Sequence, residues 1–433
     1  MLKILAITIT TIITSFYYFP IIFAAFPFIN TKQAIALIGS VIWGMQISTK
    51  KSGSLDKELF SLSLLGIVFS LVCLFSVTYN STTDHVYSTY IASMWVWLAG
   101  AYGVCCIIKM LHGSASLRTI SHYLIAVCVI QCILALLIDY NIGLKTFIDT
   151  HILQDQEFLT RVKRLYGIGA MLDTAGIRFS IALILITHLI TSKKAGKKRI
   201  LSASYLLAFI IITVIGNIIA RTTLTGVILS LLYAAYKQFF VKSHKPFEPK
   251  EILFGLIIIT CVCIPIVTYF YNTNAVFHKN LRFGFEGLFS LVEQGTWKVS
   301  SNEQLKTMIV FPKTIKTWLI GDGYFNNPIA VDPYFTGTIT RGYYMGTDIG
   351  YLRFIFYCGT IGLLVFSLYI CKAVKICIHR FPTGKILLLL LGILNFIVWF
   401  KVSTDIFLIF ALLLVADPEV STDRTRKIEF PIR

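Results

Sequence analysis

The feature that most constrains this chain is a series of long apolar segments that recurs from its first residues almost to its end. A helix that crosses a bilayer needs about 20 mostly apolar residues. Hydrophobic residues make up 56% of the 433 residues and charged residues 14%, whereas about a quarter of a soluble domain is charged. Twelve segments qualify as spans: 3–25, 33–48, 59–79, 88–108, 121–140, 177–192, 200–219, 222–241, 251–271, 349–371, 385–400 and 403–416.

The sequence therefore predicts an all-α polytopic membrane protein, a single integral membrane domain over residues 1–433 with about twelve transmembrane helices. The second, sixth, eleventh and twelfth segments are shorter than the others. Tilted, partly re-entrant and buried helices are all compatible with such lengths.

Lysine and arginine are concentrated in alternate connections between the apolar segments. One set includes 193–199, 237–250 and the tail at 424–433, and it is much richer in basic residues than the other set. Cytoplasmic loops are enriched in Lys and Arg, so both termini are predicted to be cytoplasmic. The net charge of +18 then matches an anionic membrane surface, and no nucleic-acid partner is expected.

Two connections on the opposite, outer side are unusually long. The first is 141–176, and the second is 272–347, between the ninth and tenth spans. Connections in compact proteins are usually only a few residues long, and long ones often carry function. The second is rich in aromatic residues, so we expect it to be folded. Its stretch 301–319 predicts an amphipathic helix on the membrane surface, broken near Pro312.

The ten cysteines lie in or beside apolar segments, and neither long outer loop contains one. A disulfide-stabilised outer domain is therefore not expected, and no Cys or His spacing typical of a metal site is present. The sequence predicts no metal and no other cofactor.

A charged residue marks the tight hairpin between the seventh and eighth spans. Arg221 lies at the tip of 216–226 and is followed by three hydroxyl residues. An arginine fork can hold a phosphate through two donors, and hydroxyls can add further ones. The alternative is an arginine that extends to the outer lipid headgroups.

Positive charges also gather where few are expected, on the outer side at 161–180. Arg161, Arg164 and Arg178 lie in this stretch together with glycines. An anionic substrate at the outer leaflet would explain them. The alternative is a solvated loop that is neutralised by neighbouring carboxylates such as Asp173.

The end of the second outer loop combines carboxylates with aromatic rings. Tyr343 and Tyr344 follow Arg341, and this combination suits a sugar, which has apolar CH faces and polar hydroxyl edges. Asp348 begins the tenth span. Two roles are open for it there, the N-cap of the helix and a base at the membrane edge. Arg353 lies deeper and requires a partner.

The connection between the last two spans also carries charge. Lys401 and Asp405 flank the sequence VST. Charges at the membrane edge suggest function by default, but here we expect a structural ion pair.

Three of these stretches, taken in order, resemble the O-antigen ligase and polymerase superfamily of bacterial inner-membrane glycan enzymes. RLYGIGAMLDTAG resembles the family's Arg-x-x-Gly element, and ARTTLTG resembles its short Ser-Arg-Thr-type hairpin. LIGDGYF and then TDIGYLRFIFYCGTIGLL resemble its Gly-x-Gly segment and the helix after its large loop. The resemblance runs over residues 160–365, and the order of the motifs carries most of it.

The resemblance implies a multi-pass protein of the bacterial inner membrane with its active site facing the periplasm. Its partners would be undecaprenyl-pyrophosphate-linked oligosaccharides, membrane lipid, a flippase and a chain-length regulator. Ligases of the family carry a His where this chain has Thr347-Asp348, so an O-antigen polymerase is favoured. The alternatives are an O-antigen ligase that transfers the glycan to lipid A-core, and a polysaccharide flippase or transporter.

The implied reaction is glycosyl transfer with a pyrophosphate leaving group. Arg221 and Arg164 would stabilise the leaving charge, and Asp348 would orient or deprotonate the acceptor hydroxyl. Other outer-side residues are expected to bind substrate: Arg161, Arg178, Arg341, Arg353, Tyr343 and Tyr344. A transporter would instead place charges near mid-membrane on several helices.

Overall fold

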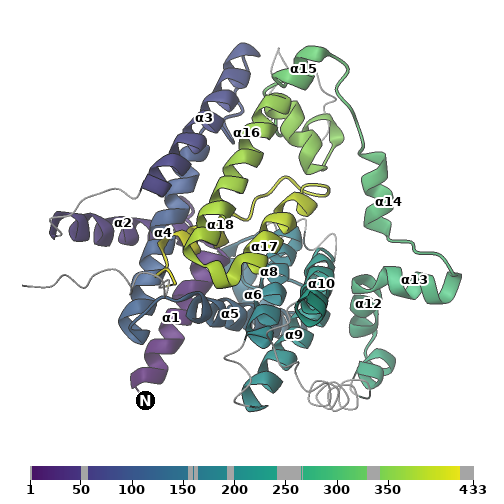
Figure 1. The fold of residues 1–433 in the computed structure, drawn as a ribbon. Helices are drawn as coiled ribbons and strands as arrows, with labels where there is room; N and C mark the ends of the chain where they lie inside the picture. The colour runs from purple at the N-terminus through teal and green to yellow at the C-terminus, as the bar shows by residue number, and fades with distance from the viewer. Residues whose placement is uncertain are drawn as a thin grey trace, which may run out of the picture.

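The computed structural model describes residues 2–49, 57–154, 159, 164–192, 199–240, 265, 267–328 and 342–419. Most of these residues are helical, which confirms the all-α prediction (Figure 1). A short antiparallel ladder joins β1 (Ile22–Phe23) to β2 (Ile152–Leu153). Most of the predicted span 251–271 lies outside the described residues.

The helices differ widely in length. In chain order they are α1 (Leu2–Tyr18), α2 (Thr31–Thr49), α3 (Lys57–Tyr79), α4 (Tyr90–His112), α5 (Leu117–Tyr140), α6 (Ile142–His151), α8 (Leu172–Thr191), α9 (Arg199–Ile219), α10 (Thr223–Phe240), α12 (Ala275–Gly284), α13 (Glu286–Gln294), α14 (Ser300–Thr307), α15 (Ile315–Leu319), α16 (Gly350–Arg380), α17 (Lys385–Val398) and α18 (Phe407–Val415), with 3₁₀ turns η2 (Tyr344–Gly346) and η3 (Pro382–Gly384). Among the described helices, α3, α4, α5, α8 and α16 are long and apolar enough to cross a membrane.

The long helices are apolar on both faces. On α3, Phe69 and Cys73 are buried, whereas Phe60, Leu71 and Phe75 are more than half exposed. A helix that is apolar all round requires an apolar environment on every side. The exposed face of α3 therefore meets lipid, and the protein is embedded in a membrane.

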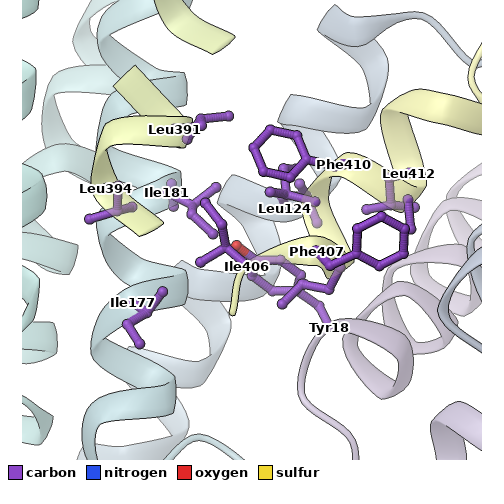
Figure 2. Close-up of a cluster of buried hydrophobic side chains, with 14 of the residues drawn as sticks. Tyr18, Leu124, Ile177, Ile181, Leu391, Leu394, Ile406, Phe407, Phe410 and Leu412 are labelled. Carbon is purple, nitrogen blue, oxygen red and sulfur yellow. The ribbon is translucent and has the colours of Figure 1, made fainter. Parts of the chain in front are cut away.

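Five helices meet in the centre of the bundle. Figure 2 shows side chains from α1, α5, α8, α17 and α18 in contact there, among them Tyr18, Ile181 and Phe410. The residues of α18 are almost all buried. Its nine residues rise only about 14 Å, whereas the hydrocarbon core is about 30 Å thick. The predicted span 403–416 is thus a buried half-helix and not a lipid-exposed crossing.

The predicted span 349–371 is not one straight helix. Within α16, Gly359 has φ +69° and ψ −179°. The rings of Phe354 and Phe366 lie 5.3 Å apart, although twelve residues of straight helix rise about 18 Å. The two halves of α16 therefore fold toward each other. Glycine is required at the bend, because a Cβ there would lie 2.0 Å from the carbonyl oxygen of Leu319.

The second outer loop is folded, as predicted, in its described parts. Helices α12 to α15 follow one another along one side of the molecule (Figure 1). The amphipathic helix predicted over 301–319 is divided into α14 and α15, which are separated by a segment that contains Pro312. The indole nitrogen of Trp318 donates to the Pro312 carbonyl oxygen at 3.0 Å, so this break is fixed by a specific contact.

Candidate functional site

Three separate stretches of the chain meet at Lys401. Its Nζ lies 2.6 Å from Asp173 Oδ1 at the start of α8 and 3.2 Å from Thr222 Oγ1 in the hairpin between α9 and α10. The Thr222 hydroxyl also donates to Asp173. The predicted pairing of Lys401 with Asp405 is therefore wrong: Asp405 instead accepts a hydrogen bond from the backbone N–H of Phe407, the first residue of α18, at 2.8 Å.

Close packing of α8 against α10 fixes the position of the hairpin. A Cβ on Gly226 would lie 2.3 Å from the Cα of Ser180, so only glycine allows this approach. The Ser180 hydroxyl donates to the Thr222 carbonyl oxygen at 3.0 Å and accepts from Gly226 N–H at 3.2 Å. The small residues of ARTTLTG thus set where Arg221 and Thr222 lie.

Arg221 is held by the outer helices. Its Nη2 lies 2.7 Å from Glu286 Oε2, and its Nε donates to the Phe283 carbonyl oxygen at 3.0 Å. Its Nη1 donates to Ser301 Oγ at 3.2 Å, and its Cζ lies 4.0 Å from the centre of the Phe283 ring. Protein groups therefore bind all three nitrogens of this guanidinium.

A second guanidinium approaches the same aromatic ring. The Cζ of Arg164 lies 5.0 Å from the centre of the Phe283 ring. Burial lowers the pKa of Arg164, while the Asp173 carboxylate opposes that shift. Arginine nevertheless remains charged at neutral pH. Two of the predicted cationic residues thus come together at Phe283, Arg164 from the first long connection and Arg221 from the hairpin between α9 and α10.

A cavity opens beside Arg221. Its volume is about 490 Å³, within the usual range for small-molecule sites. Charged, hydroxyl and aromatic groups line it: Arg221, Arg282, Phe283, Glu286, Phe289, Ser290, Glu293, Gln294, Lys298 and Ser300. Arg282 is committed to Glu293 through two bonds of 2.8 and 2.6 Å. This wall can offer donors to phosphate and ring faces to sugar.

Arg353 is buried and has the partners that its depth requires. Its side chain is only 7% exposed, and it donates to Ser403 Oγ and to Asn326 Oδ1, both at 2.8 Å. Its Cζ lies 3.7 Å from the Phe325 ring centre and 4.0 Å from that of Tyr343. Arg353 therefore ties the start of α16 to the turn between α17 and α18.

Asp348 lies at the edge of this arrangement. Its Oδ1 is 3.7 Å from Arg353 Nη1, and a quarter of its side chain is exposed. Burial raises the pKa of Asp348 to about 6, although Arg353 opposes that shift. Asp348 does not cap α16, because Ile349 occupies the N-cap position. A partly accessible carboxylate with such a pKa suits a general base.

The remaining predicted residues divide into three groups. Tyr343 belongs to the site through Arg353, and burial raises its pKa. Arg178 lies apart from Arg221, over the ring of Phe19 at 5.1 Å, and Tyr344 packs on Tyr324 at 5.3 Å between ring centres. Arg161 and Arg341 lie outside the described residues.

Sequence reasoning missed the partners that complete the site. Glu286 and Phe283 were not predicted. The sequence alone assigns Arg221 no partner, and a carboxylate and an aromatic ring in the long connection are the residue types that could supply one. Ser403 was missed because a serine in a polar turn is unremarkable by itself. In the part of the chain that the structure describes, no group of three or more His, Cys, Asp or Glu forms a metal-ligand set.

Comparisons of the chain with known protein families, with curated proteins and with solved structures find no match.

Proposed function

We propose that the protein is a membrane glycosyltransferase of the O-antigen polymerase type. It would join undecaprenyl-pyrophosphate-linked oligosaccharide repeat units at the periplasmic face of the bacterial inner membrane. The observation that supports this proposal most is that separate stretches of the chain bring their charged residues together. Four stretches selected separately from the sequence supply Arg164, Arg221, Asp348 and Lys401 to one end of the helix bundle.

The proposed reaction exchanges one bond at the sugar for another. An acceptor hydroxyl oxygen bonds to the anomeric carbon, and the bond from that carbon to the pyrophosphate oxygen breaks. The electron pair leaves with the lipid pyrophosphate, and the acceptor proton passes to Asp348. Arg221 and Arg164 stabilise the charge on the leaving oxygen, and one preorganised donor of this kind contributes about 3 kcal/mol.

Binding of the lipid pyrophosphate requires a rearrangement at Arg221. Glu286 lies against one edge of its guanidinium. The pyrophosphate would replace this carboxylate and extend into the cavity beside it. Phe283, which lies under both guanidinium groups, would keep them oriented during the exchange.

The other half of the site would serve the acceptor. Arg353 would hold the site together rather than contact the sugar, because its Nη1 and Nη2 already donate to Ser403, Asn326 and the Phe325 carbonyl oxygen. It instead orients Asp348 and Tyr343. Asp348 would accept the hydroxyl proton, and the ring of Tyr343 would pack on the acceptor sugar.

One observation favours a second candidate, a transporter. Broken helices and half-helices are common at the substrate sites of transporters, and α16 bends at Gly359 while α18 has only nine residues. Against this, Arg221, Arg164 and Asp348 gather at one end of the bundle and not at its middle.

The surface polysaccharide of a deletion strain tests the proposal. A polymerase defect leaves single repeat units on lipid A-core, and complementation with the wild-type gene restores long chains. A ligase defect leaves uncapped core with long lipid-linked glycan. A flippase defect leaves lipid-linked single repeats that are protected from reagents added to the periplasm, and that outcome would overturn the proposal.

A further inference from the structure

Histidine–tyrosine pairs occupy the end of the bundle opposite the candidate site. His122 Nε2 of α5 lies 2.6 Å from Tyr205 Oη of α9, and His188 Nδ1 of α8 lies 2.8 Å from Tyr233 Oη of α10. The ring planes are nearly parallel in both pairs, at 22° and 6°. These contacts join α5 to α9 and α8 to α10, and the candidate site adjoins the other ends of α8, α9 and α10.

Arg118 lies among these pairs at the start of α5. Its Nη2 donates to Ser192 Oγ, just after α8, at 3.4 Å. From Asp173 to Ser192 the chain is almost entirely helix α8. That helix rises about 30 Å, close to the thickness of the hydrocarbon core. Arg118 therefore lies at the membrane face opposite Asp173, the face predicted to be cytoplasmic.

The charges around Arg118 have one sign. Lys237 Nζ lies 5.8 Å from the centre of the ring of Tyr233, the partner of His188, and Arg118 and Lys237 both act electrostatically on His188. Among the described residues, Arg118 and Lys237 form no ion pair.

The acidic residues nearby are engaged elsewhere. Asp417 pairs with Lys109 at 2.7 Å, Glu419 binds Thr383, and Glu58 binds His379. A positive cluster that has no counter-ion among the described residues attracts an anion when it lies at a membrane face.

Exposed apolar side chains adjoin this cluster on α10. Lys237 is flanked by Phe239 and Phe240, which are 78% and 75% exposed, and Leu232 is 58% exposed. Such side chains suit acyl chains and do not suit a free ion in water. These apolar side chains therefore favour a phospholipid over free phosphate as the ligand.

We propose that Arg118 and Lys237, which lie beside the histidine–tyrosine pairs, bind the headgroup of an anionic phospholipid of the cytoplasmic leaflet. The headgroup phosphate lies against Arg118 between the ends of α5, α8, α9 and α10, and the acyl chains lie along α10. This inference is independent of the proposed reaction, because no residue of the outer site takes part in it.

The test uses the purified full-length protein in nanodiscs of phosphatidylcholine with increasing phosphatidylglycerol. Bound phosphatidylglycerol is counted by native mass spectrometry, and the midpoint of thermal unfolding is followed in parallel. Wild-type protein is expected to retain phosphatidylglycerol preferentially and to be stabilised by it. Arg118→Gln is expected to weaken retention about fivefold, the usual effect of one basic residue at an anionic surface.

Lys109→Gln is the matched control, because Lys109 lies at the same face but is paired with Asp417; it is expected to retain the lipid as wild type does. Lys237→Gln provides a second variant should Arg118→Gln fail to fold. Unchanged retention in both variants would overturn the proposal. Equal stabilisation of the protein by inorganic phosphate in pure phosphatidylcholine would overturn the lipid assignment.

Discussion

Arg221 Nη2 lies 2.7 Å from Glu286 Oε2, so the guanidinium best placed to bind a phosphate already has a carboxylate partner from the outer loop. This relationship separates two functions that Arg221 could have. A purely structural arginine needs only Glu286 and the Phe283 carbonyl oxygen. An arginine that binds substrate must release Glu286 and bind the substrate in its place. Substitution of Arg221 should then weaken substrate binding, whereas substitution of Glu286 should strengthen it.

Arg221→Lys is expected to abolish long-chain polymer, because lysine keeps the charge but loses the planar fork. Arg221→Ala is expected to be at least as defective, with a loss of about 100-fold or more in rate. The measurements are polymer length and transfer rate with a lipid-linked repeat unit, normalised to protein in the membrane. Lys306→Ala, an exposed position on α14, is the control. Wild-type polymer from Arg221→Lys would contradict a phosphate-binding role.

Glu286→Gln is expected to increase the affinity for pyrophosphate or its lipid ester, because the competing carboxylate is removed while the side chain keeps its shape. Binding to the purified protein measures this directly. Glu293→Gln is the matched control, since Glu293 pairs with Arg282 in the same cavity. Equal effects of the two substitutions would show that general charge, rather than exchange at Arg221, governs binding.

Asp348→Asn is expected to reduce chain extension about 100- to 10,000-fold if the carboxylate is the base. The pKa of Asp348 is raised to about 6, and the ionised form is the active one, so wild-type activity should fall as the pH drops through 6. The residual activity of Asp348→Asn should not show this fall as the pH drops through 6.

The same pKa predicts a stability effect with a definite sign. Because the folded-state pKa lies above the ordinary value of about 3.9, ionisation of Asp348 destabilises the fold as the pH rises through 6. Asp348→Asn should therefore not lower the unfolding midpoint at pH 7. A large drop would indicate that Asp348 is instead a structural partner of Arg353.

His278 is the single histidine of the connection 272–347, so it is the residue there that could take the place of the ligases' His. His278→Ala is expected to leave polymer nearly unchanged. His278 lies on α12, where its ring stacks on Tyr271 at 4.0 Å and its Nδ1 contacts the Tyr271 carbonyl oxygen, so its loss removes a local packing contact. Polymer analysis and protein abundance are the measurements. An inactive His278→Ala beside an active Asp348→Asn would restore the ligase alternative.

Reporter fusions test the orientation on which the whole site depends. A fusion after Ser300 is expected to report the periplasm and a fusion after Gly196 the cytoplasm, because of the distribution of Lys and Arg. A cytoplasmic reporter at Ser300 would reject both the predicted topology and the proposed active site.

Much of the helix arrangement could be predicted because apolar length is a direct physical requirement of the bilayer. The long helices α3, α4, α5 and α8 follow the predicted spans closely. The bend at Gly359 could not be predicted, since it depends on contact with Leu319 from another part of the chain. For 403–416 the sequence left tilted, re-entrant and buried helices open, because a run of apolar residues has the same hydropathy whether it faces lipid or lies buried. The structure shows that α18 is buried.

In the candidate site, too, some residues could be predicted from the sequence and others could not. Arg221, Arg164, Asp348 and Lys401 were detectable because charge at the edge of an apolar segment is costly. Their partners were not, because an ion pair such as Lys401 with Asp173 joins positions far apart in the chain. Hydropathy and charge locate the costly groups, and only the fold shows how each one is satisfied.

The pairing of charges across the site has a consequence for how substrate is captured. Glu286, Asp173 and Asp348 each lie beside a cation, so their fields largely cancel beyond a few ångströms. Little long-range attraction then remains for an anion approaching through the solution or along the headgroups. Initial capture should accordingly vary little with ionic strength, and selectivity should arise only after the pyrophosphate has reached Arg221 and displaced its carboxylate partner.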